Sequence, residues 1–372
     1  MQAPLTESAI NAGENRHKVW LVNAPVDLLF CCGGLLWVFI ALHSIFVSRA
    51  HRFPLLSGHG SSSGENLLAS VLLAAAFLFT YPHHAATWNR LYGSLSSIRK
   101  YWFCSLFMPL LIIALLILAL LNPSLIHLFV IATAVTTMHH WVAQSYGIGM
   151  IYFMRSGISL SNFDRRLISI SCQTLTVFLA LRLLSSETLQ RSLSLGINLK
   201  ASALIPVQYS KSFETAAYVF WAIAFCILLL KWIKGRLMPP LAVIALFAST
   251  ARALLNSVDS CVDILFYGLP LFHSLQYLVL SSRYYAKDHK IFEETDKASL
   301  RDFLKEAKIQ RYFLMLFALG GIVYTVMPRL VQFSGLSLVS ASALVFLLLN
   351  LHHIISDGFI WRLKDPEVRG RV

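Results

Sequence analysis

Long apolar stretches recur along this chain from Val26 to Ile360, and they constrain its fold more than any other feature. A bilayer core about 30 Å thick needs about 20 mainly apolar residues per helix. Inside a bilayer, backbone polar groups must be satisfied internally, which this pattern achieves as α-helices. Hydrophobic residues make up 57% of the chain and charged residues only 13%, about half the charged fraction of soluble domains. The sequence therefore excludes an ordinary soluble enzyme and predicts an all-α, polytopic membrane bundle.

We predict about ten transmembrane helices in a single membrane domain. They fall near residues 26–48, 66–92, 101–121, 124–153, 165–184, 214–233, 238–256, 258–282, 311–333 and 335–360. The predicted domains are an N-terminal segment (1–25), the transmembrane domain (26–360) and a basic tail (361–372). Within the transmembrane domain, loop 283–310 has apolar residues at near-helical spacing with charges between them, which predicts an interfacial amphipathic helix.

Positive charge gives an orientation for these helices. Basic segments precede the first predicted span and occupy every second loop, whereas 122–124 and 257–259 contain no Lys or Arg. The positive-inside rule then places both termini in the cytoplasm. This distribution explains the net charge of +13 better than a nucleic-acid-binding face does, so we expect no nucleic-acid partner. We expect a multi-pass protein of a bacterial inner, or cytoplasmic, membrane, surrounded by membrane lipids.

Glycine pairs occur in two of the apolar segments, "CCGGLLW" (31–37) and "ALGGIVY" (318–324). Small residues allow helix backbones to approach closely in membranes. Both segments therefore predict close helix packing.

Seven of the thirteen histidines lie on four predicted spans that all run from outside to inside. They are His83 and His84, His139 and His140, His273, and His352 and His353. At 1.5 Å per residue, the last histidine of each group lies about 9 to 22 Å before the first basic residue that follows it. We therefore expect these side chains to meet in the cytoplasmic half of the bilayer.

Further polar residues follow the histidines by about one helical turn, which places them on the same helix faces. They are Gln144, Gln276, Tyr277 and Asp357. Intramembrane ionisable groups are costly, and several on matched faces indicate a functional site. We predict a metal site with all seven histidines as candidate ligands and Asp357 as a ligand or an orienting partner. Tyr146, Tyr277, Gln144 and Gln276 are candidate catalytic residues for proton delivery or substrate orientation.

The types of donor atom narrow the choice of metal. Imidazole suits iron, copper and zinc. A tetrahedral zinc site needs only four ligands, so the surplus of histidines favours iron, as one ion or two. Adjacent side chains in a helix point about 100° apart. Both members of an HH pair can therefore join one cluster only at a helix edge or around two metals.

At these HH pairs the chain resembles the integral-membrane histidine-box desaturases and hydroxylases. Those proteins carry HxxxH and HxxHH boxes, whereas this chain has Thr80, Thr136 and Leu349 three residues before its pairs and so keeps only the HH. The resemblance implies histidines gathered from cytoplasmic helix ends around two irons. It also implies oxidation of lipid chains.

The favoured hypothesis is a membrane-embedded, metal-dependent oxidoreductase of the oxygenase, hydroxylase or desaturase type, acting on a hydrophobic, lipid-like substrate. The chain has no GxGxxG fingerprint or P-loop, so we expect an external electron donor. One alternative is a haem- or chlorophyll-type pigment protein, in which histidines ligate tetrapyrroles. Another is a proton-coupled transporter, in which intramembrane His and Asp relay protons.

Overall fold

The computed structural model describes residues 20–47, 63–122, 124–185, 205–234, 241–256, 268–292 and 299–372. The regular elements in these ranges are helices, as predicted. The longest are α4 (Ser63–Tyr92), α7 (Ser124–Arg155), α8 (Asn162–Ser185), α10 (Val207–Lys234), α12 (Leu269–Asp288), α14 (Ala307–Gln332) and α15 (Leu338–Ile360). The shorter ones are α2 (Ala24–Val26), η1 (Asp27–Cys31), α3 (Gly34–Val47), α5 (Leu95–Lys100), η2 (Phe103–Phe107), α6 (Met108–Leu121), α11 (Leu241–Asn256), α13 (Leu300–Lys305) and α16 (Pro366–Arg371).

The first predicted span is helical but broken after η1. The chain bends by 53° between Ala24–Cys31 and Gly34–Ala41. Gly33 has a φ of +93°, which glycine adopts without steric cost, and a Cβ there would lie 2.4 Å from the Ser249 side chain. The Ser249 hydroxyl donates to the Cys32 carbonyl at 2.7 Å. The first glycine pair therefore allows a break as well as close packing, which the sequence pattern did not reveal.

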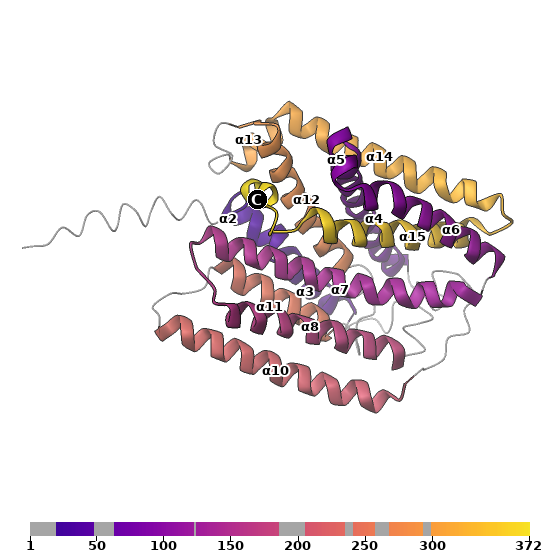
Figure 1. The fold of residues 1–372 in the computed structure, drawn as a ribbon. Coiled ribbons are helices and arrows are strands. Elements are labelled where there is room, and N and C mark those ends of the chain that lie inside the picture. The colour runs from indigo at the N-terminus through magenta and orange to yellow at the C-terminus, as the bar shows by residue number, and fades with distance from the viewer. Residues whose placement is uncertain are drawn as a thin grey trace, which may run out of the picture.

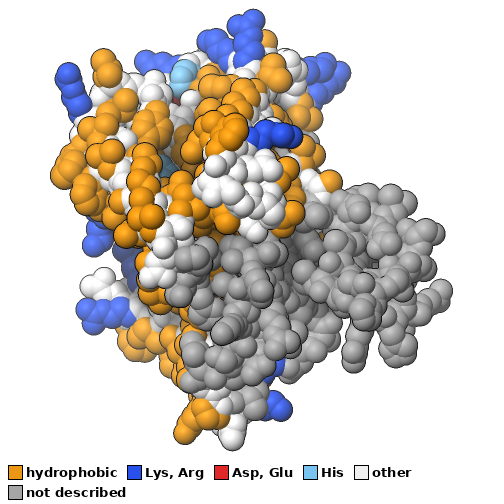
Figure 2. All heavy atoms as spheres, turned by 90° about the vertical axis from the view of Figure 1, so that its right-hand side faces the viewer, with side chains coloured by type: hydrophobic (Ala, Val, Ile, Leu, Met, Phe, Trp, Pro, Cys, Tyr) orange, Lys and Arg blue, Asp and Glu red, His pale blue; other side chains and the backbone are white. Residues whose placement is uncertain are grey.

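Four described helices are long and apolar enough to cross a membrane: Phe103–Leu121, α8, α14 and α15. The bent pair at the N-terminus would make a fifth. On α6, Leu110, Ile113 and Ile117 are more than half exposed, and contiguous exposed apolar surface of this kind marks a membrane interface. Figure 2 shows hydrophobic side chains over much of one face, with many Lys and Arg gathered at its upper edge. The structure thus indicates a multi-pass membrane protein, while ten spans and cytoplasmic termini stay predictions.

The histidine-bearing helices pack against one another at the centre of the bundle. Figure 1 places α10 and α14 at opposite edges, with α7 and α15 between them. Helix α4 contacts α12, α14 and α15, and α7 contacts α15, α11 and α8. Gly320 of α14 permits one of these contacts, because a Cβ there would lie 2.6 Å from the Tyr81 carbonyl oxygen on α4. In the second glycine pair, Gly320 thus serves close packing, as predicted, whereas a Cβ at Gly321 would meet open space.

Two segments outside the predicted spans, the amphipathic loop and the basic tail, contain short helices. In the predicted amphipathic loop, α12 continues to Asp288, residues 293–298 lie outside the described ranges, and α13 follows. Ser299 and Asp302 form a capping box at the start of α13, and Phe303 is buried. The C-terminal segment forms α16, which Asp365 caps through the Glu367 N–H at 3.0 Å.

Candidate metal centre

Four buried histidines from four helices meet at one point in the bundle. They are His83 on α4, His140 on α7, His273 on α12 and His353 on α15, and one nitrogen of each lies within 4.8 Å of the others. The Nε2 atoms of His140 and His353 are 3.2 Å apart. The prediction that histidines from four helices meet is confirmed for these four, while their depth in the bilayer stays a prediction.

Each HH pair divides between the cluster and another environment, because neighbouring helical side chains point in different directions. The Nδ1 atom of His84 contacts the Tyr324 hydroxyl of α14. The Nε2 atom of His352 lies 3.0 Å from the Cys104 carbonyl oxygen of η2. His139 is exposed on the surface of α7. The structure therefore brings one histidine of each pair into the four-histidine cluster, although the His84 ring stacks beside that of His353, with centroids 4.5 Å apart.

Asp357 lies beside the cluster, one turn after His353. Its Oδ2 atom is 3.5 Å from Nε2 of His353 and 3.7 Å from Nε2 of His140. Its other oxygen, Oδ1, accepts hydrogen bonds from the hydroxyls of Thr87 (2.9 Å) and Tyr277 (3.0 Å). Asp357 is thus held on one side and presents the other carboxylate oxygen to the histidines.

Thr87 also fixes the protonation of His353. Its single hydroxyl hydrogen is donated to Asp357, and the same oxygen lies 2.8 Å from Nδ1 of His353. With that hydrogen on Asp357, the oxygen accepts at this second contact, and this arrangement places the imidazole proton on Nδ1. The Nε2 atom of His353 then presents a lone pair toward His140 and Asp357. Electron-rich atoms at these distances repel one another unless a proton or a cation lies between them.

The other two histidines supply unpaired nitrogens. Nε2 of His83 and both ring nitrogens of His273 are buried and have no hydrogen-bond partner among the described residues. The Nδ1 atom of His83 lies 3.3 Å from the Ser274 hydroxyl, which orients the ring. A buried polar atom without a partner costs about 1–3 kcal/mol. Coordination to a cation would satisfy Nε2 of His83 and one ring nitrogen of His273.

The cluster fits a transition-metal ion. With metal–nitrogen bonds of about 2.1 Å, two ligand atoms lie about 3.0 to 4.2 Å apart, depending on the angle between them. The separations here begin at 3.2 Å and extend to 4.8 Å, so small side-chain movements would close the four imidazoles around one ion. Their donors are neutral imidazoles with a carboxylate nearby, which suits iron, copper or zinc rather than calcium or magnesium.

The predicted catalytic residues occupy different positions around the cluster. The Tyr277 hydroxyl contacts Thr87 and Asp357 and accepts from the Trp361 indole at 2.9 Å. Gln144 donates to the His273 carbonyl and to the Gln276 side chain, both at 2.9 Å.

Two further residues from the predicted set lie away from the imidazole nitrogens. Gln276 donates to the Cys31 carbonyl at 2.8 Å, so it ties α12 to the broken N-terminal helix. Tyr146 packs, half-buried, against the largest hydrophobic cluster.

A cavity of about 200 Å³ adjoins the cluster. Its polar lining includes His140, Gln144, Tyr277 and Asp357. The rest of its lining is Ala143, Gly147, Ile148, Ile151, Leu280, Gly358, Trp361 and Leu363. The cavity therefore joins a polar group of side chains to a mainly apolar wall.

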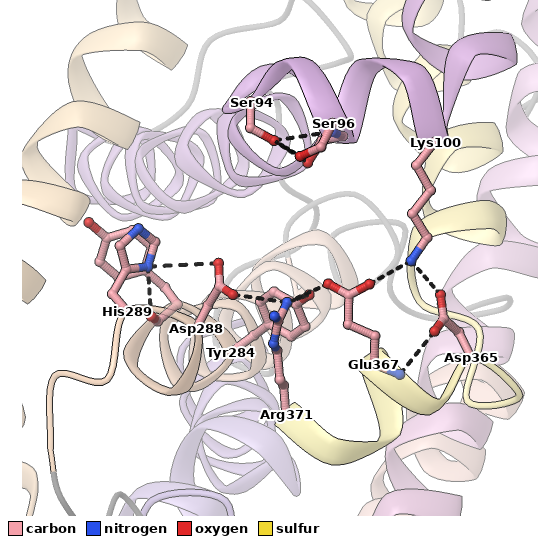
Figure 3. Close-up of polar contacts among 11 residues, drawn as sticks. Ser94, Ser96, Lys100, Tyr284, Asp288, His289, Asp365, Glu367 and Arg371 are labelled. Carbon is pink, nitrogen blue, oxygen red and sulfur yellow. Dashed lines mark hydrogen bonds and ion pairs between the residues drawn. The ribbon is translucent and has the colours of Figure 1, made fainter.

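The C-terminal segment is anchored beside this cavity, since Trp361 and Leu363 line it and α16 follows directly. Figure 3 shows Lys100 of α5 reaching two carboxylates at the start of α16, Asp365 and Glu367, each at 2.7 Å. These hydrogen bonds lower the pKa of both carboxyl groups. At the other end of α16, Arg371 pairs with Asp288 (2.9 Å) and Glu367 (2.6 Å) and donates to Tyr284 (2.7 Å).

Sequence reasoning missed Thr87 and Trp361, which complete the surroundings of Asp357. Thr87 follows His83 by four residues, the same offset that pointed to Gln144 and Asp357, so helical spacing could have found it. Trp361 follows directly after α15, at the end of the last predicted span, where an aromatic residue is typical of an interfacial anchor.

Comparison of the chain with protein-family models, curated proteins and solved structures gives no match.

Proposed function

We propose that this chain is a membrane-embedded, metal-dependent oxidoreductase that acts on a hydrophobic, lipid-like substrate. The observation that carries the proposal is the convergence of four buried imidazoles and Asp357, with ring nitrogens of His83 and His273 left unpaired. The adjoining cavity, with its apolar wall, supports an apolar substrate.

Iron is the metal that fits the proposed reaction best. A redox-active ion in such a site supplies activation of dioxygen when bound. Zinc has no redox chemistry and would leave an oxidoreductase without an electron acceptor. Reducing equivalents would come from an external electron donor, in keeping with the absence of a nucleotide-binding motif in the sequence.

The chain's own residues would then bind the metal ion, orient the substrate and exclude water. His83, His140, His273 and His353 hold the ion, and Asp357 is placed either to ligate it or to hydrogen-bond to a group on it. Tyr277 holds a proton at its hydroxyl, which it donates to Asp357.

A haem protein is less well supported. A tetrapyrrole is a flat ring held between axial ligands on its two faces. Four nitrogens that all lie within 4.8 Å of one another leave no gap for such a ring, because two of them would stand where the ring must pass. This compact cluster of four nitrogens favours a metal ion without a tetrapyrrole ring.

Elemental analysis of detergent-purified protein, together with its visible spectrum, tests the proposal. We expect stoichiometric iron without a Soret band in the wild type, and loss of the metal in His140→Ala and His353→Ala. Protein without any stoichiometric transition metal would refute the proposal. A Soret band would support the pigment-protein alternative, and metal retained in both variants would show that other residues bind it.

A further inference from the structure

The cavity beside the metal centre is elongated. Along α7 its lining runs from His140 to Ile151, which corresponds to about 16 Å at 1.5 Å per residue. Its lining residues on α12 and in the C-terminal segment, among them Leu280 and Leu363, likewise follow the histidines in the chain. The cavity therefore extends from the centre toward the ends of three helices, where Arg155 terminates α7.

Polar side chains are concentrated at the inner end of this cavity. His140, Tyr277 and Asp357 lie there, and Gln144 already donates to the His273 carbonyl and to Gln276. Beyond Gln144 the lining is aliphatic apart from glycines and Trp361. Burying an unpartnered polar group costs about 1–3 kcal/mol in proteins. The polar head of an amphiphile is therefore disfavoured along this wall, whereas an alkyl chain is accommodated.

Two glycines line the cavity without a packing reason to be glycine. A Cβ added to Gly147 or Gly358 would meet no heavy atom within 4 Å, and neither residue has a positive φ. By contrast, Gly149 lies two residues after Gly147 and does not line the cavity, and a Cβ there would lie 2.6 Å from Phe247. Glycine inside a helix costs about 1 kcal/mol relative to alanine. At both cavity positions, glycine has this cost but leaves free the space that a side chain would fill.

We propose that Gly147 and Gly358 set the width of a channel for one linear apolar chain, which enters tail-first. This inference rests on the proposed function and names the substrate class of the same site. The head group stays at the outer end, between the exposed Arg362 and Lys364 that flank Leu363. The terminal carbons of the chain, rather than those next to the head group, then lie beside His140 and Asp357.

Fluorine relaxation in purified protein loaded with paramagnetic cobalt(II) tests this orientation. The probes are palmitate fluorinated at its terminal methyl and palmitate fluorinated next to its carboxylate, with zinc-loaded protein as the diamagnetic reference. We expect the terminal fluorine to relax faster, because paramagnetic relaxation falls steeply with distance. Gly147→Leu should abolish this excess relaxation while keeping the cobalt content. Gly321→Leu is the matched control, since it also meets open space but lies on α14, outside the cavity lining.

The channel and the proposed function would be overturned by different outcomes. Equal relaxation of the two probes, or excess relaxation unchanged in Gly147→Leu, would overturn the channel. If Gly147→Leu loses cobalt, Gly358→Leu provides the same test from α15. Wild-type protein that takes up no stoichiometric metal would instead overturn the proposed function, before either probe is measured.

Discussion

Replacing Thr87 by valine removes one hydroxyl from the surroundings of the metal centre and keeps the shape of the side chain. That hydroxyl contacts Nδ1 of His353 at 2.8 Å, Oδ1 of Asp357 at 2.9 Å and the Tyr277 hydroxyl at 2.6 Å. Loss of a group that orients a metal ligand lowers metal affinity by about 10- to 100-fold. This corresponds to about 1.4 to 2.7 kcal/mol of binding free energy.

The same substitution leaves the Nδ1–H of His353 without its buried acceptor. An unmade buried hydrogen bond costs about 1–3 kcal/mol, so Thr87→Val should lower both the stability of the apoprotein and its affinity for metal. Competition titration with a chromophoric chelator measures the affinity, and thermal unfolding measures the stability. Thr87→Ser, which retains the hydroxyl, should recover most of the affinity.

Thr176 on α8 supplies a matched control for this experiment. It is a buried threonine whose hydroxyl has no hydrogen-bond partner among the described residues. Thr176→Val should therefore leave metal affinity unchanged, and it should not lower stability. Wild-type metal affinity in Thr87→Val, measured beside this control, would refute the positioning role of Thr87.

Three further predictions follow from other contacts. His140→Ala should abolish metal binding, whereas His139→Ala, at the exposed neighbour, should keep the metal content of the wild type by elemental analysis. Gly320→Leu should destabilise the fold, because its Cβ would lie 2.6 Å from a carbonyl oxygen of α4; an unchanged melting temperature would contradict this contact. The hydrogen bond from Lys100 lowers the pKa of Asp365. The ion pair therefore stabilises the C-terminal segment fully above the usual carboxyl pKa of about 3.9. This stabilisation is lost as the pH falls through the lowered folded-state pKa. Limited proteolysis of the C-terminal segment should accelerate on acidification through this range, and less so in Lys100→Gln, whose segment is already loosened at neutral pH.

The helical architecture could be predicted from the sequence because apolar runs of this length leave the backbone few alternatives. The break at Gly33 could not, because a span of suitable hydropathy reads as continuous. The bend depends on a tertiary contact, the hydrogen bond from Ser249 to the freed Cys32 carbonyl, about 217 residues away in the chain. Local sequence signals contain no information about such a partner.

The site could be predicted as far as its helices and only in part at the level of single side chains. The histidines on four spans identified the helices that meet, and helical offset identified Asp357. Which member of each HH pair turns inward depends on the rotation of the helix about its axis. Two adjacent histidines point in different directions, so the sequence of the pair does not determine this rotation. Contacts with Tyr324 on α14 and with the Cys104 carbonyl on η2 settle it for His84 and His352.

These contacts bear on the number of metal ions. A site for two ions would use both members of the pairs, and the surplus of histidines left one ion or two open. Here the second histidines join neighbouring helices: His84 links α4 to α14, and His352 links α15 to η2. Four imidazoles and one carboxylate remain around a single point, enough donors for one ion with a position to spare for a substrate or dioxygen. The doubled histidines therefore fit one ion: His84 and His352 hold ligand-bearing helices in place, whereas His139 is exposed.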